Sequence, residues 1–240
     1  MSFSRSGSAY ISPNVVRTNL PVKLPMTRAA KPRSYDSGSR KEAAQKTRRS
    51  ILASARREFL ERGYAGTTMA QIAGGAGVAI DTVYATTGKK PMLFRLLVEA
   101  AISGRDEAVP AEQRDYVRAM RAEPNAAKKL QLYAAALRAI QPRLAPLFRV
   151  LQAAAPLDAD LNEMWQEIAH RRAANMRLLA NELAATGQLR EGLTVTKAAD
   201  IIWSMNSPEF YLLLVEQRRW SSVDFERWLG DAWIRLLLRT

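Results

Sequence analysis

Arginine and lysine are the side chains best placed for chemistry, and they gather at the N-terminal end of the sequence. Residues 1–50 of the 240-residue chain hold eleven Lys and Arg against two Asp and Glu, whereas residues 101–240 hold nineteen against seventeen. Such a concentration of cations suits a polyanionic partner, which is DNA, RNA or an anionic membrane. A solvated basic tail without a partner explains the charge equally well.

The residue types that carry catalysis are scarce. The sequence has no cysteine, which excludes a thiol nucleophile, a disulfide framework and cysteine-ligated zinc or iron–sulfur sites. Its one histidine, His170, stands beside two arginines without the motif of a metal site or of a Ser–His–Asp hydrolase. We therefore expect no catalytic residues, no metal and no cofactor, and we do not expect an enzyme.

The segment Thr87–Lys90 resembles the end of a nucleotide-binding loop. That motif requires glycine where this chain has Val83, and it requires serine or threonine where this chain has Lys90. No strand is predicted before the segment either. We therefore reject nucleotide binding at this position.

Helices must position these side chains. From Arg40 onward apolar residues recur with helical spacing, and no stretch of four or more residues alternates convincingly between apolar and polar. The sequence therefore predicts an all-α fold. Residues 1–39 lack this periodicity and are rich in Ser, Gly, Pro and Arg, so we expect a disordered basic extension there, with Met26 as an alternative translation start.

Three short helices follow one another next to the basic segment. The first ends at Gly63, the second begins after a threonine N-cap at Thr67 or Thr68, and the third spans Ala79–Ala85. Between the second and the third, Gly77 supplies the residue that tolerates the positive φ of a tight turn. This arrangement predicts a helix-turn-helix.

The same helices carry a longer motif. Over about fifty residues the chain resembles the N-terminal DNA-binding domain of the tetracycline-repressor (TetR) family of bacterial transcription regulators, through the string Phe59-x3-Gly63-Tyr64-x2-Thr67-Thr68-x3-Ile72-Ala73-x2-Ala76-Gly77-Val78-x3-Thr82-Val83-Tyr84-x5-Lys90-x2-Leu93. The resemblance implies a helix-turn-helix DNA-binding domain at residues 40–87, followed by a connecting helix and a C-terminal regulatory and dimerisation bundle at residues 88–240. It also implies a homodimer whose paired third helices enter successive major grooves of a near-palindromic operator in double-stranded DNA.

The resemblance assigns roles to individual positions. Thr68, at the start of the second helix, contacts phosphate. The exposed opening of the third helix meets base edges through Ala79, Ile80, Asp81 and Thr82. Tyr84 and Lys90 contact the DNA backbone, and Lys89 assists Lys90. The basic residues before this unit predict an arm that seeks phosphate or the minor groove: Arg40, Lys41, Lys46, Arg48 and Arg49.

The sequence departs from the family pattern at several positions. Thr87 stands where the family usually has phenylalanine, so an apolar plug between the third and fourth helices is missing or supplied elsewhere. Pro91 replaces a usual glutamate, which the first turn of a helix tolerates. Gly74 and Gly75 replace better helix formers, at a cost of up to about 1 kcal/mol each. Asp81 suits cytosine but repels phosphate.

Beyond residue 110 the sequence predicts further helices, including a long one over Asp158–Ala185 and a last one after Ser221 or Ser222. We interpret the prolines as breaks between helices: Pro124, Pro142, Pro146, Pro156 and Pro208. The resemblance implies a small-molecule effector bound in this bundle, and the candidate pocket residues are Tyr133, Phe148, Trp165, Met176, Trp203 and Phe210. Aromatic and methionine side chains at helical spacing equally suit a plain bundle core.

Dimerisation is predicted through the last two helices, about residues 208–219 and 222–238, with help from the helix over 158–185. Residues 210–215 are apolar all round a helix, which is more than one core-facing stripe buries. Trp220, Trp228 and Trp233 add aromatic area of the kind that interfaces favour. The alternative is that this helix is central in its own bundle.

Together these features predict a sequence-specific transcriptional regulator, and we expect a ligand-responsive repressor that occludes its operator. The longest apolar runs are six residues, Leu132–Leu137 and Phe210–Val215, far short of the roughly 20 that a membrane-spanning helix needs. We therefore expect a cytoplasmic protein without a membrane partner. The alternative is a basic helical protein that binds DNA, anionic membranes or other proteins without operator specificity.

Overall fold

The computed structural model describes residues 37–106 and 108–239, and the chain is helical in these ranges. The α-helices are α1 (Ser37–Arg62), α2 (Met69–Ala76), α3 (Ile80–Thr87), α4 (Lys90–Ser103), α5 (Asp115–Ala122), α6 (Ala126–Ala154), α7 (Ala159–Ala185), α8 (Val195–Met205), α9 (Pro208–Tyr211) and α10 (Ser222–Leu237). Short 3₁₀ turns cover Ala111–Gln113 and Ala155–Leu157, and a π-helical segment covers Leu212–Gln217.

The all-α prediction is confirmed. The described ranges contain no strand, and their one extended pairing is an isolated bridge between Leu189 and Leu238. Within the same ranges, no helix combines the length and the hydropathy that a membrane crossing requires.

Helix α1 begins earlier than the sequence predicts. Residues 37–39, which we assigned to the disordered extension, form its first turn. The Lys, Glu, Ala and Gln residues at 41–46 are strong helix formers, and they let the helix extend as an exposed arm beyond its buried C-terminal half. The rest of the predicted extension, residues 1–36, lies outside the described residues.

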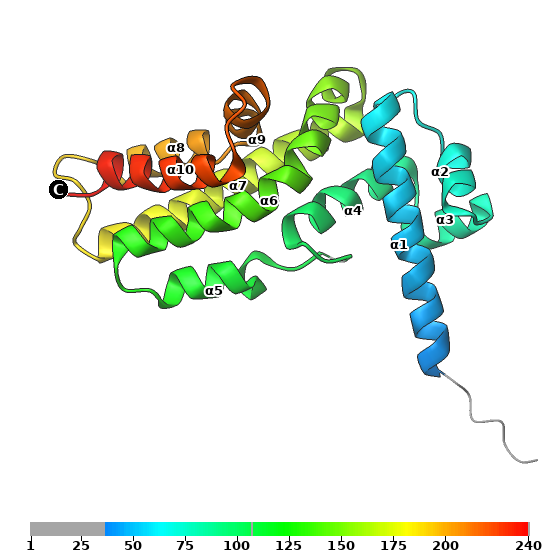
Figure 1. Ribbon diagram of the computed structural model, residues 1–240, viewed down its shortest axis with the longest axis horizontal. Coiled ribbons are helices and arrows are strands. Elements are labelled where there is room, and N and C mark those ends of the chain that lie inside the picture. The colour runs from blue at the N-terminus through cyan, green and yellow to red at the C-terminus, as the bar shows by residue number, and fades with distance from the viewer. Residues whose placement is uncertain (1–36, 107, 240) are drawn as a thin grey trace, which may run out of the picture. The chain divides into compact units, whose positions relative to one another are not determined.

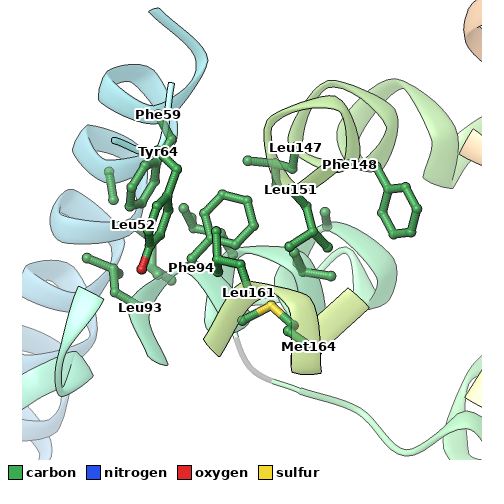
Figure 2. Close-up of a cluster of buried hydrophobic side chains, with 14 of the residues drawn as sticks. Leu52, Phe59, Tyr64, Leu93, Phe94, Leu147, Phe148, Leu151, Leu161 and Met164 are labelled. Atoms are coloured by element: carbon green, nitrogen blue, oxygen red, sulfur yellow. The ribbon is translucent and has the colours of Figure 1, made fainter. Parts of the chain in front are cut away.

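A first cluster of buried side chains joins the N-terminal helices to the C-terminal ones. The rings of Phe59, Tyr64 and Phe94 pack with centroids 5.1–5.7 Å apart. Figure 2 shows Phe94 of α4 between the rings of Phe59 and Tyr64 on one side and the side chains of Leu147 and Leu151 of α6 on the other. The cluster continues to the first turns of α7. Helix α4 is therefore part of the same core as the helix-turn-helix and as α6.

A second cluster holds the C-terminal helices together. It is formed by α5, the first half of α6, the second half of α7, and α8 to α10. Figure 1 shows α6 and α7 side by side, with α10 against α6. Trp233 is fully buried in this cluster and stacks on Tyr133, with ring centroids 5.4 Å apart. The prediction that Trp233 contributes to a dimer interface is therefore wrong, because the whole side chain is buried within its own chain.

Two of the predicted helix breaks are also wrong. Pro142 and Pro146 lie inside α6, which runs without interruption from Ala126 to Ala154. Each proline removes one backbone hydrogen bond, at roughly 3 kcal/mol in a helix interior. The two are four residues apart and therefore on one face, where Pro142 is exposed and Pro146 half-buried. The opposite face buries a long apolar stripe, and this burial outweighs the local cost.

The helix starts predicted from capping residues agree with the structure better than the helix breaks predicted from prolines. Thr68, Ser207 and Ser221 are N-caps whose side chains accept hydrogen bonds from the backbone of α2, α9 and α10. Pro208 occupies the first position of α9, as predicted. Asp158 caps α7, which confirms the long helix predicted there.

Candidate functional site

The second helix of the helix-turn-helix has a fixed start and a fixed end. Thr68 Oγ1 accepts from the Gln71 N–H at 3.2 Å, and Gln71 Oε1 accepts from the Thr68 N–H at 2.8 Å, which makes a capping box. At the other end Gly77 has φ +69°, and the Val78 N–H reaches back to the Ala73 carbonyl at 3.1 Å. These contacts set where α3 begins.

The opening of α3 is exposed. Val83 and Thr87 are buried and attach the helix to the core, whereas Ile80 and Tyr84 leave 40% and 44% of their surface accessible. The predicted base-facing residues lie on this outer surface or at its edge, with Ala79, Ile80 and Asp81 exposed and Thr82 half-buried. Exposed apolar side chains on a helix held by its other face are suited to contact with another molecule.

Thr68 and the two lysines lie at the starts of α2 and α4. Thr68 is exposed, Lys89 is the exposed N-cap of α4, and Lys90 is half-buried in its first turn. The Lys90 Nζ lies 4.2 Å above the Tyr64 ring, which is a cation–π contact. Burial lowers the pKa of Lys90, and the Asp158 carboxylate opposes that shift.

Tyr64 is held by the same surroundings. Its ring is buried under Lys90 and against Phe59, and burial raises the pKa of its hydroxyl above the ordinary value, with a further rise from Asp158 and Asp160 at the start of α7. Lys90 therefore packs on the Tyr64 ring, and the acidic residues at the start of α7 act on the same ring.

Arg48 and Arg49 contact the described protein rather than standing apart. The Arg48 Nε donates to the Asp106 carbonyl at 3.1 Å, and its Nη1 donates to the Thr86 carbonyl at 3.5 Å. Arg49 forms an exposed ion pair with Asp106, with an N–O distance of 3.5 Å. Arg48 thus contacts the C-terminal end of α3, and both arginines contact Asp106, which follows α4. Lys41 and Lys46 are exposed nearer the N-terminal end of α1.

Two departures from the family pattern have structural explanations. Thr87 is buried in place of an aromatic plug, and its hydroxyl donates to the Val83 carbonyl at 2.9 Å, so the polar group is satisfied within α3. At Gly75 a Cβ atom would lie 2.4 Å from Ser54 Oγ and from Arg57 Nη2. Glycine at position 75 therefore permits the close approach of α1 and α2.

A cavity of about 650 Å³ lies among α4, α5, α6 and α7. Three of the predicted pocket residues line it, Tyr133, Phe148 and Met176. The other three do not line it. Trp165 packs on Phe148, Trp203 lies under the Arg172 guanidinium, and Phe210 stacks on Trp228.

Sequence reasoning missed the polar residues of this cavity. Gln141 is 1% exposed, and Arg172 and Asn206 lie beside it. Burial lowers the pKa of Arg172. A signal was present, because Gln141 interrupts the apolar stripe of α6 between Leu137 and Leu144.

Ion pairs tie α4 to α7 along the edge of the cavity. Arg95 pairs with Glu167 at 2.5 Å, and Glu99 pairs with Arg171 at 2.6 Å. Glu99 also lies 4.0 Å from Arg114, which precedes α5. Arg95, Glu99, Arg114 and Arg171 all line the cavity. A molecule that enters the cavity would therefore meet the helix that leads to the helix-turn-helix.

Comparison with known proteins identifies the N-terminal helices. Residues 51–95 match the family model described as bacterial regulatory proteins, tetR family. These helices are similar to the DNA-binding domain of that family. No curated protein matches the chain significantly.

Solved structures of transcriptional regulators share the fold beyond this domain. NalD of Pseudomonas aeruginosa, the secondary repressor of the MexAB-OprM multidrug efflux pump, is 24% identical with a TM-score of 0.65, over 82% of this chain and 98% of NalD. A TetR-family regulator of Mesorhizobium loti is 21% identical with a TM-score of 0.59, over 82% of this chain and 98% of its own. FadR of Bacillus subtilis in complex with stearoyl-CoA is 18% identical with a TM-score of 0.59, over 78% and 98%. At these identities the likeness shows that the chain shares the fold of these proteins.

Proposed function

We propose that this chain is a ligand-responsive transcriptional repressor that binds a near-palindromic operator as a homodimer. The observation that carries the proposal is the position of α4. Its Leu93 and Phe94 are buried with the helix-turn-helix, and its Arg95, Glu99 and Ile102 line the cavity. One helix thus contacts both the DNA-binding helices and the site for an effector.

The DNA-binding surface in this proposal is the outer face of α3 with the starts of α2 and α4. Ile80, Asp81 and Thr82 meet base edges, while Thr68, Tyr84, Lys89 and Lys90 hold the DNA backbone, and Arg48 and Arg49 support them from α1. In a dimer the two α3 helices must lie about 34–36 Å apart to reach successive major grooves. A small displacement of α4 by an effector then disrupts binding.

The proposed domain boundaries separate the DNA-binding helices from the helices around the cavity. Residues 40–87 form the DNA-binding domain, and residues 88–240 form the connecting helix and the regulatory and dimerisation bundle. The repressor NalD and the stearoyl-CoA complex of FadR support repression and effector binding as the roles of this fold.

Selection of genomic DNA fragments by the purified protein tests the proposal. We expect enrichment of a near-palindromic site and a fall in affinity for that site when the cavity is filled. Salt-dependent binding to all fragments without enrichment would contradict the proposal and support a basic protein without operator specificity.

A further inference from the structure

One end of the cavity is polar, and its groups converge on a single residue. Asn206 follows α8 as its C-cap, and the side chains of Gln141, Arg172 and Tyr133 form hydrogen bonds with it. Gln141 Nε2 donates to the Asn206 carbonyl at 2.8 Å, and Arg172 Nη2 donates to Asn206 Oδ1 at 2.7 Å. Asn206 Nδ2 donates to the Tyr133 hydroxyl at 2.7 Å. All four residues line the cavity.

Gln141 has an acceptor without a donor. Its Oε1 is buried and has no hydrogen-bond partner in the described part of the chain. Rotating the Gln141 amide by 180° does not solve this, because Oε1 would then face the Asn206 carbonyl oxygen and the hydrogen bond from Nε2 would be lost. A buried acceptor without a donor is costly, so this end of the cavity favours a molecule that brings an N–H or O–H group.

Arg172 offers donors at the same end. Its guanidinium has five N–H bonds, and the two described acceptors, the Trp203 carbonyl and Asn206 Oδ1, both use Nη2. Among the described residues no ion pair of Arg172 is found; burial lowers the pKa of its guanidinium, and the negative charge of Glu209 opposes that shift. The other arginines that line the cavity each face a carboxylate: Arg95, Arg114, Arg121 and Arg171.

We propose that the effector is an uncharged molecule with an apolar body and a hydroxyl head, whose O–H donates to Gln141 and whose oxygen accepts from Arg172. This inference rests on the proposed function, because it names the chemistry of the effector in the same cavity. Phe148, Ile140 and Leu144 supply the surface for the apolar body. A hydroxyl both donates and accepts, and it therefore satisfies both residues.

Other heads match only half of the site. A carboxylate accepts from Arg172 but presents a second acceptor to Gln141. An ammonium donates to Gln141 but meets the positive charge of Arg172. An ether oxygen accepts and cannot donate. The structure therefore ranks a hydroxyl above all three.

Calorimetric titration of the full-length protein without DNA tests the ranking. The probes are para-octylphenol, its methyl ether para-octylanisole, and para-octylbenzoate. We expect the phenol to bind roughly tenfold more tightly than the ether, which lacks one buried hydrogen bond, and more tightly than the benzoate.

Two glutamine variants assign the preference to Gln141. Gln141→Met removes the acceptor at similar volume, and the phenol and the ether should then bind with equal affinity. Gln152→Met changes an exposed glutamine of the same helix and should keep the wild-type ratio. Melting temperatures establish that both variants are folded, and if Gln141→Met is not, the three wild-type affinities still decide.

The outcomes are separable from those of the proposed function. Equal binding of phenol and ether by the wild type, as expected if water is the partner of Gln141, overturns the hydroxyl proposal, and so does tightest binding of the benzoate. Either result leaves operator recognition and ligand response intact. Absence of operator selectivity would contradict the proposed function without changing the ratio of affinities. Failure of all three probes to bind overturns the hydroxyl proposal.

Discussion

Lys90 is the residue whose role at DNA is easiest to isolate. Its amine lies over the Tyr64 ring at the start of α4 and carries a charge that phosphate would attract. We expect Lys90→Ala to weaken binding to all DNA sequences alike and to lower the salt slope by about one ion. Binding titrations at several salt concentrations measure both quantities. Lys128→Ala, at an exposed lysine in the first turn of α6, serves as the control and should change neither.

Ile80 and Thr82 should behave differently, because base contacts carry sequence information. We expect Ile80→Ala and Thr82→Ala to change the preference among operator variants by about 1–3 kcal/mol. Competition binding with single-base operator variants measures this preference. If both substitutions instead reduced affinity uniformly, like Lys90→Ala, the outer face of α3 would not be the base-reading surface.

At the scale of elements, the packing of α2 on α1 depends on Gly75. An alanine Cβ at this position would lie 2.4 Å from the Oγ of Ser54, whose hydroxyl donates to the Ile72 carbonyl at 2.9 Å. We expect Gly75→Ala to destabilise the fold by about 1–3 kcal/mol, since the helices must shift or lose that bond. Urea denaturation measures the change.

Gly74 provides the matched control in the same helix. A Cβ there meets nothing within 4 Å, and alanine is the better helix former. Gly74→Ala should therefore stabilise the protein by roughly 0.5–1 kcal/mol. If the two substitutions had the same effect, close packing at Gly75 would not be limiting.

At the scale of the whole molecule, the C-terminal end retains apolar surface that its own fold does not bury. Leu213, Val223, Trp228 and Leu236 are 49%, 43%, 38% and 41% exposed, on the π-helical segment and on α10. This surface is where we expect a second copy of the chain to dock.

Surface changes test the dimer better than removal of α10, because Phe225, Leu229 and Trp233 of that helix are fully buried. We expect the double variant Leu213→Glu and Leu236→Glu to be a folded monomer with much weaker operator binding. Sedimentation velocity measures the oligomeric state. Leu157→Glu, at an 89% exposed residue between α6 and α7, should leave the state unchanged. A double variant that sediments as wild type would remove this surface from consideration.

The sequence by itself determined the elements whose signals are local. The N-caps Thr68, Ser207 and Ser221 and the glycine turn at Gly77 each act within four residues along the chain, so spacing alone located α2, α3, α9 and α10. Tertiary structure decided what depends on contacts between distant segments. It carried α6 through Pro142, buried Trp233, and joined Gln141 and Arg172 to Asn206 across 65 and 34 positions. A polar residue on an amphipathic helix has the same sequence pattern whether it faces water or a cavity, and only packing against other helices distinguishes the two.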